Sequence, residues 1–113
     1  MKTQDQLYLV LTKQWFTEIL EGRKHEEYRA FTDFYISRLC EVDDKGEIQD
    51  MRKYKTVKFQ QGYQKNAPQM IVEVTDIFIE MDEDVHPENG DFLTTDNCNF
   101  VIALGKILSK THC

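Results

Sequence analysis

Long apolar stretches are missing from this sequence. No run approaches the roughly 20 residues that a membrane-spanning helix requires. The first six residues, Met1 to Gln6, also lack the apolar core of a signal peptide. These two absences predict a soluble, cytoplasmic protein that has no membrane partner.

Cysteine is scarce, and its spacing matches no common site. Cys40, Cys98 and Cys113 are an odd number of thiols and form no Cys-x-x-Cys pair. Such a set favours free thiols in a reducing compartment. His112 stands next to Cys113, but companion ligands at zinc spacing are missing. We therefore expect neither a metal nor another cofactor.

The sequence also lacks repeats, low-complexity segments and a recognisable linker. Its 113 residues suit one domain that buries roughly 65% of the surface of the unfolded chain. We therefore expect a single domain over residues 1–113.

Positive charge is in the minority, but it is unevenly distributed. The net charge is −6, yet residues 1–66 carry 12 Lys/Arg and 11 Asp/Glu, whereas residues 67–113 carry 2 and 9. A basic run without any acidic residue extends from Arg52 to Lys65 and is interleaved with three aromatic residues: Tyr54, Phe59 and Tyr63. One cationic face on an otherwise acidic chain is compatible with selective binding of a nucleic acid.

One stretch, Gly22 to Arg29, concentrates the reactive side chains. Gly22 follows an apolar-periodic run that ends at Leu20, and it suits the left-handed position just after a helix. Alternation in the strand that follows places three polar side chains on one face, namely His25, Glu27 and Arg29. Lys24 stands at the turn before this alternation begins, so it can lean toward the same cleft as Glu27 and Arg29.

The same stretch matches a known spacing, Gly-x-Lys-x-x-Glu-x-Arg, with Gly22, Lys24, Glu27 and Arg29. The pattern resembles the signature of the ASCH domains (activating signal cointegrator homology), a branch of the PUA-like β-barrels, and in particular their small stand-alone members of bacterial or phage type. Further segments resemble later and earlier landmarks of the family: Leu9 to Phe16, Phe59 to Pro68 and Ile102 to Leu108. The resemblance covers most of the chain, except about Met81 to Asn99.

Periodicity predicts the elements of the first third. Leu7 to Leu11 is a continuous apolar run, which predicts a strand covered on both faces. A helix is expected from Lys13 to Glu21, with four residues on its buried side: Trp15, Phe16, Ile19 and Leu20. A second helix begins after Thr32 as N-cap and directs three residues inward: Phe34, Tyr35 and Leu39.

The middle of the chain is predicted to alternate between polar connections and strands. Val42 to Lys53 is polar and is expected to form a mobile loop with a turn at Asp43 to Gly46. Tyr54 to Gln60 is expected to be a strand with two inward residues, Val57 and Phe59. Gln61 to Pro68 is read as a connection.

The last third predicts two strands. Met70 to Glu80 is long, and its buried phase slips near Thr75-Asp76, which indicates a bulge or bend. The final strand is expected from Asn99 to Leu104, interrupted or bulged at Gly105. The sequence leaves open whether the acidic segment Met81 to Asn99 forms a loop or a short helix.

These elements predict the α+β class. The ASCH resemblance sharpens this to a PUA-like β-barrel of five to six mostly antiparallel strands with two short helices. It also implies a cleft beside the first helix, lined by Lys24, Glu27 and Arg29. The loop from Tyr63 to Pro68 would be its facing wall.

The first functional hypothesis is a module that binds RNA or a nucleotide-like ligand in this cleft, with a regulatory role in RNA metabolism. Arg29 can hold a phosphate as a fork and Lys24 can hold one as a point charge. Glu27 can accept a hydrogen bond from a base amino group, and an aromatic residue, Tyr63 or Phe59, can stack on a base. The candidate ligand-binding residues are Lys13, Lys24, Glu27, Arg29, Lys58, Tyr63, Lys65 and Asn66.

The second hypothesis is an enzyme, with Lys24 and Glu27 as the catalytic residues. Some small bacterial ASCH-like proteins hydrolyse acetylated cytidine with a lysine of this signature, a threonine and a glutamate. Here Glu27 stands where the threonine would be, and its carboxylate favours the charged ammonium rather than the neutral amine that a nucleophile requires. Efficient hydrolysis is therefore not expected. Ribonuclease activity, also attached to some ASCH proteins, would use a lysine with a tyrosine or serine, and no spacing selects such a pair here.

Two further interpretations stay open. The signature charges of Lys24, Glu27 and Arg29 also fit a structural ion-pair network. The acidic segment, in turn, suits a protein-interaction module whose partner is a basic peptide or subunit.

Overall fold

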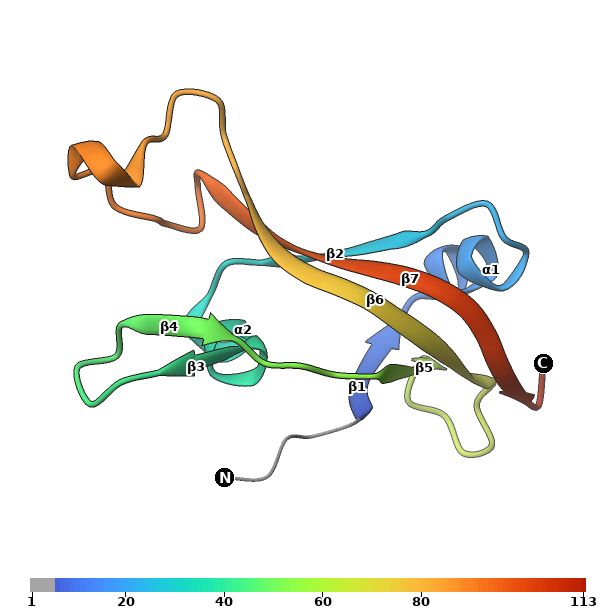
Figure 1. Cartoon of the computed structure of the whole chain (residues 1–113). Helices are drawn as coiled ribbons and strands as arrows, with labels where there is room; N and C mark the ends of the chain where they lie inside the picture. Colours follow the sequence, from blue (N-terminus) through green and yellow to red (C-terminus); the bar gives the residue numbers. More distant parts are fainter. Residues whose placement is uncertain (1–5) are drawn as a thin grey trace. The chain divides into compact units, whose positions relative to one another are not determined.

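The computed structural model describes residues 6–113, so most of the segment inspected for a signal peptide lies outside the described residues. The chain divides into two compact units. Unit 1 comprises Met1–Glu27, Lys53–Asp76 and Ala103–Cys113, and unit 2 comprises Tyr28–Arg52 and Ile77–Ile102. Figure 1 follows the chain through both. In the described part of the chain, every helix is too short or too polar to cross a membrane.

A mixed sheet of five strands has the order β1-β5-β6-β7-β2 (Figure 1). Its strands are β1 (Gln6–Leu11), β2 (Glu26–Ala30), β5 (Thr56–Gln61), β6 (Gln69–Met81) and β7 (Cys98–Thr111). β1 runs parallel to β5, and β5 runs antiparallel to β6. With the two short helices α1 (Lys13–Leu20) and α2 (Asp33–Leu39), this curled sheet confirms the predicted α+β, barrel-like class.

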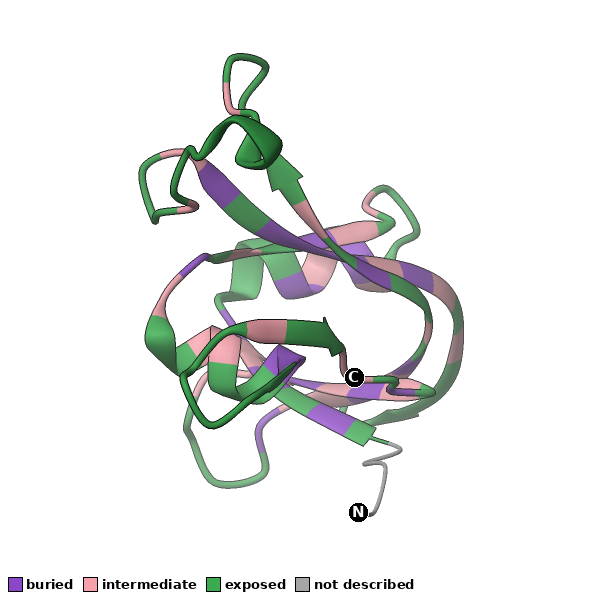
Figure 2. Cartoon of the chain, turned by 60° about the vertical axis from the view of Figure 1, so that its left-hand side comes forward, coloured by how far each residue is buried: buried purple, intermediate pink, exposed green. Residues whose placement is uncertain are grey.

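In unit 1, β1 is a strand as predicted, but only one of its faces is buried. Leu7, Leu9 and Leu11 are buried, whereas Tyr8 is 50% exposed. The expected coverage of both faces is therefore wrong. A continuous apolar run contains no charged residue, but it can contain a tyrosine. The polar hydroxyl group of a tyrosine allows it to lie on an exposed face. The purple and green bands of Figure 2 show this alternation along the strands.

The core of unit 1 follows the predicted phase of β5. Val57 and Phe59 are fully buried, and they pair across the ladder with Val72 and Met70 of β6. The buried phase of β6 then changes, because Val72 is buried, Thr75-Asp76 is exposed and Ile77 is buried again. This confirms the predicted slip in phase at Thr75-Asp76.

β7 continues to Thr111, so the predicted interruption at Gly105 is wrong. A Cβ atom at Gly105 would lie 2.2 Å from Oε1 of Glu73. The same carboxylate oxygen accepts a hydrogen bond from the Lys106 backbone N–H at 3.3 Å. Glycine therefore marks a close approach of a side chain to the strand, and not a break in it.

In unit 2, the stretch predicted as a mobile loop contains a hairpin. β3 (Cys40–Val42) pairs antiparallel with β4 (Ile48–Met51). The predicted turn between them is present, because the Asp43 carboxylate accepts from the backbone N–H groups of Lys45 and Glu47, both at 2.9 Å. The loop prediction is wrong because a short hairpin needs few apolar residues once an aspartate organises its turn.

Helix α2 begins as predicted, but one of the three residues that were predicted to point inward is exposed. The Thr32 hydroxyl accepts from the Tyr35 N–H, so Thr32 is the N-cap. Leu39 is fully buried, whereas Phe34 is 55% exposed, which makes its predicted inward position wrong. The guanidinium of Arg38 lies 4.2 Å from the Phe34 ring and stabilises it at the surface.

The acidic segment that the sequence left open is mostly turns. It contains one short 3₁₀-helix, η1 (Pro87–Asn89), which ends at Gly90 with φ +90°. Before it, the Asp82 N–H donates to the Asn97 carbonyl at 3.0 Å. After it, the Asn97 side chain donates to the Phe92 carbonyl and accepts from the Thr94 N–H.

Candidate functional site

The end of α1 determines where Lys24 lies. Gly22 has φ +78°, and its N–H donates to the Ile19 carbonyl at 3.1 Å, while the Arg23 N–H donates to the Glu18 carbonyl at 2.9 Å. These two bonds form a Schellman motif, with Gly22 at the left-handed position that the sequence predicted. The Lys24 N–H also donates to the Glu18 carbonyl, at 3.1 Å. The chain therefore reverses tightly, and Lys24 begins beside the helix that it has just left.

Lys24 and Glu27 form an ion pair that is largely withdrawn from water. Lys24 Nζ lies 3.1 Å from Glu27 Oε1, and the two side chains are 18% and 7% exposed. Of the three residues expected to line one cleft, Lys24, Glu27 and Arg29, the structure thus brings the first two into contact. Glu27 is the buried charged residue of the described chain, and the nearby ammonium offsets the cost of its desolvation.

Trp15 is the third member of this group. Lys24 Nζ lies 4.3 Å from the centroid of the Trp15 ring, which is within the range of a cation–π contact. The Trp15 residue is nevertheless 44% exposed, so its predicted place in the core is wrong. Phe16 and Ile19 alone are the buried residues of α1. Trp15 shares its face of the helix with Glu18 at i+3 and with Ile19 at i+4, so helical spacing alone does not decide whether Trp15 is exposed.

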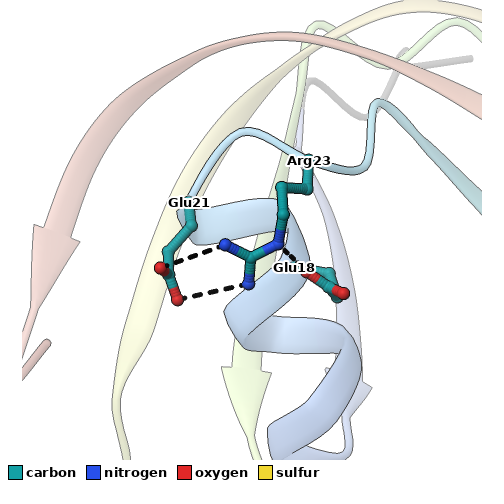
Figure 3. A network of polar contacts seen from close by, with 3 residues as sticks. All are labelled: Glu18, Glu21 and Arg23. Carbon is teal, nitrogen blue, oxygen red and sulfur yellow. Dashed lines mark hydrogen bonds and ion pairs between the residues drawn. The ribbon is translucent and has the colours of Figure 1, made fainter.

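The next residue, Arg23, forms a second cluster of charges on the solvent side of the turn (Figure 3). Its guanidinium donates to Glu21 at 3.1 and 3.4 Å and to Glu18 through Nε. The hydrogen bonds that Arg23 donates to Glu21 and then to Glu18 raise the pKa of Arg23 above its usual value. Arg23 is 55% exposed, so water screens this cluster.

The loop predicted as a facing wall is attached near the start of α1. The Gly62 N–H donates to the carbonyl of Leu11, the last residue of β1, at 3.0 Å. A chain of amide contacts supports this turn, because Gln69 donates to Gln60 and Gln60 donates to the Gly62 carbonyl, both at 2.7 Å. The loop therefore leaves β5 beside the first turn of α1.

The other candidate residues of unit 1 are distributed around this loop and the first turn of α1. Exposed positions are held by Lys13, Tyr63, Lys65 and Asn66, and Lys58 is half-buried on β5. Tyr63 is 87% exposed, whereas Phe59 is fully buried. Phe59 is therefore wrong as a stacking candidate, because it fills the core through the inward phase of β5.

Arg29 belongs to unit 2. Its Nη1 donates to the Tyr35 hydroxyl at 2.8 Å, and its guanidinium carbon lies 5.6 Å from the Tyr35 ring. The basic run is divided in the same way, because Arg52 belongs to unit 2 and donates from Nε to the Cys40 carbonyl at 3.1 Å. The residues from Lys53 onward belong to unit 1.

The cysteines are free thiols, as predicted. Burial raises the pKa of the Cys40 thiol to about 11, an effect that the charge of Arg52 partly opposes. Burial also raises the pKa of Cys98. Within residues 6–113, no group of His, Cys, Asp or Glu side chains could hold a metal ion.

Comparisons of the chain with protein-family models, with curated proteins and with solved structures found no match.

Proposed function

We propose that the chain is an ASCH-type module that binds single-stranded RNA or a nucleotide-like ligand through unit 1, with a regulatory role in RNA metabolism. The observation that supports this most is the position of Lys24, whose ammonium lies 3.1 Å from the buried Glu27 carboxylate and 4.3 Å from an exposed indole ring. A hydrogen-bond donor, an acceptor and an aromatic ring are the three groups with which proteins bind unstacked bases.

The charge of the two units supports the same assignment. The sequence of unit 1 contains 10 Lys/Arg and 7 Asp/Glu, whereas unit 2 contains 4 and 13, which gives net charges of +3 and −9. A polyanion is therefore attracted to unit 1 and repelled by unit 2. Exposed lysines such as Lys13 and Lys65 supply contacts for phosphate groups.

The experiment is a titration of a short, labelled single-stranded RNA, followed by fluorescence anisotropy at several salt concentrations. Binding is expected to saturate and to weaken with salt, with a logarithmic slope of about −0.7 for each phosphate contact. Lys65→Ala should lower both the affinity and the slope. Lys45→Ala is the matched control, because Lys45 is an exposed lysine in a turn of unit 2. If RNA binding by the wild-type protein does not saturate, the proposal is wrong.

Two further variants separate the ligand site from a purely structural ion-pair network. Tyr63→Ala should weaken RNA binding with little change in salt slope, because stacking is not a charge effect. Arg29→Ala should leave RNA binding by unit 1 unchanged, because Arg29 belongs to unit 2. A structural network predicts instead that Arg29→Ala lowers the melting temperature and that the wild type binds no RNA.

An assay with acetylated cytidine tests the enzymatic alternative. We expect no efficient hydrolysis, because a nucleophilic lysine needs a free amine and Lys24 Nζ is held by the Glu27 carboxylate at 3.1 Å. Robust turnover that disappears in Lys24→Ala would show that the chain is an amidohydrolase.

A second candidate function, binding of a basic protein segment, is favoured by one observation in unit 2. Residues 77–102 contain seven Asp/Glu and no Lys/Arg, and Phe92 among them is 85% exposed. An arginine-rich peptide should then lose affinity in Phe92→Ser as well as at high salt. Binding that depends on salt but not on Phe92 would be non-specific attraction.

A further inference from the structure

Trp15 has an environment that its place in the sequence did not predict. Its residue is 44% exposed, although tryptophan at this spacing in a short amphipathic helix usually packs into the core. Of the other three apolar residues of α1, Phe16 and Ile19 are almost completely buried and Leu20 is half-buried. The exposure is therefore specific to Trp15 and is not a general property of α1.

The Trp15 ring is held in place by the site described above. Lys24 Nζ lies over it at 4.3 Å, and the same ammonium is fixed by Glu27 at 3.1 Å. Glu27 is buried, so the ammonium has an anchor on the protein side. The Schellman motif at Gly22 fixes the backbone of Lys24 to the carbonyl of Glu18, one turn away from Trp15. An exposed ring whose orientation is determined in this way is preorganised for a planar ligand.

The combined charge of Lys24 and Glu27 favours planar ligands over anionic ones. Because the carboxylate of Glu27 compensates the ammonium of Lys24, the pair offers a donor next to an acceptor and not an excess of positive charge. A bare phosphate gains little from such a pair, since the carboxylate repels it. A base that stacks on the exposed part of the indole ring needs no such excess of charge.

We infer that Trp15 is the base-stacking residue of unit 1, and that the Lys24–Glu27 pair fixes the orientation of its ring. The ligand class is thereby a base-containing species, in a single strand or a free nucleotide, and not a polyanion in general. The inference rests on the proposed function and adds to it the group that distinguishes a base from phosphate alone.

Trp15 is also the one tryptophan of the sequence, so its fluorescence reports on this position directly. The test uses two probes of equal length, a labelled single-stranded RNA octamer and an abasic oligonucleotide with the same number of phosphates. Anisotropy of the label measures binding, and tryptophan emission measures contact with Trp15. The octamer should quench the emission with the same midpoint as the anisotropy, and the abasic probe should bind about tenfold more weakly without quenching.

Variants give an independent readout. Trp15→Leu should reduce affinity for the octamer about tenfold and leave affinity for the abasic probe unchanged, and Trp15→Phe should retain part of the difference. Tyr8→Leu is the matched control, because Tyr8 is also an exposed aromatic residue of unit 1, at 50% exposure. Circular dichroism verifies that each variant is folded, and the wild-type comparison of the two probes needs no variant.

The outcomes are distinguishable. Quenching together with a preference for the octamer supports the inference. Binding of both probes with equal affinity and unchanged tryptophan emission overturns it, while RNA binding by unit 1 still stands. Absence of any binding by anisotropy overturns the proposed function and the inference together.

Discussion

Two groups of opposite charges lie on either side of one turn and differ mainly in their exposure to water. Arg23 contacts Glu18 and Glu21 at the surface, with side-chain exposures of 55%, 34% and 52%. The next residue, Lys24, contacts Glu27 with exposures of 18% and 7%. The residue types and distances are similar, so the sequence alone could not rank the two groups.

The difference in burial decides what each group can do. Water screens the exposed cluster, so its members gain little from their contacts. In the buried pair each charge depends on the other, because an isolated charge there would lack solvation. Only the buried pair can therefore fix the orientation of an aromatic ring and present a defined arrangement of charges to a ligand.

The largest effect should follow from the removal of one member of the buried pair. Lys24→Met leaves the Glu27 carboxylate buried beside an apolar side chain, and the free energy of unfolding should fall by about 3 kcal/mol. Chemical denaturation measures this loss. Lys13→Met is the matched control, since Lys13 is an exposed lysine of the same unit and should change stability little. Equal effects of the two substitutions would show that burial does not separate the two groups.

Cys40 extends the comparison between buried and exposed groups, because it is a buried titratable group of unit 2 that stays uncharged. Its pKa is raised by burial from 9.0 to about 11 in the folded protein. A raised pKa means that the folded state favours the protonated thiol, so this contribution is complete below pH 9 and is lost as the pH rises toward 11. Its loss should lower the free energy of unfolding by on the order of 2 kcal/mol.

The measurement for Cys40 is the difference in pH dependence between the wild type and Cys40→Ala. Lysines and tyrosines titrate in the same range, and the subtraction removes their contribution. Parallel stability curves for the two proteins between pH 8 and pH 11 would contradict the assigned burial effect.

Gly22 controls both charge groups, because the turn directs Arg23 outward and Lys24 toward Trp15. Gly22→Ala places a Cβ atom on a residue with φ +78°, which should destabilise the protein by about 1 kcal/mol. Space is not the obstacle, since a Cβ atom there would meet no atom within 4 Å. Thermal denaturation measures the loss, and an unchanged melting temperature would show that the turn adopts another conformation.

The smallest effect is expected at the exposed cluster. Arg23→Ala should leave the melting temperature unchanged within error at 0.5 M salt, because the guanidinium is screened there. A small decrease at low salt is compatible with this expectation. A large decrease that persists at high salt would place the Arg23 cluster in the same class as the buried pair.

Local patterns in the sequence predicted the elements that depend on local physics. The stop of α1 at Gly22, the N-cap at Thr32 and the inward phase of Val57 and Phe59 all follow from neighbouring residues, and the structure has them. The slip in phase near Thr75-Asp76 was visible for the same reason, since alternation of side chains is a property of one strand.

Predictions failed where distant residues decide the outcome. Gly105 suggested a break, but the Glu73 side chain from another strand explains the glycine. Helical spacing predicts a core position for Trp15, because it identifies the apolar face of the helix. It does not show where the buried part of that face ends. The direction of Lys24 toward the same cleft as Glu27 was predicted from the turn, whereas the degree of burial that gives the pair its importance depends on the packing of the whole unit.

A single titration tests the central claim most directly: backbone amide and tryptophan side-chain resonances of the labelled protein, recorded as unlabelled single-stranded RNA is added. The account predicts saturable shifts for Trp15, Lys24 and Glu27, including the indole N–H of Trp15, with residues 82–96 unchanged. Shifts confined to residues 82–96, or no shifts at all, would contradict the assignment of the ligand site to unit 1.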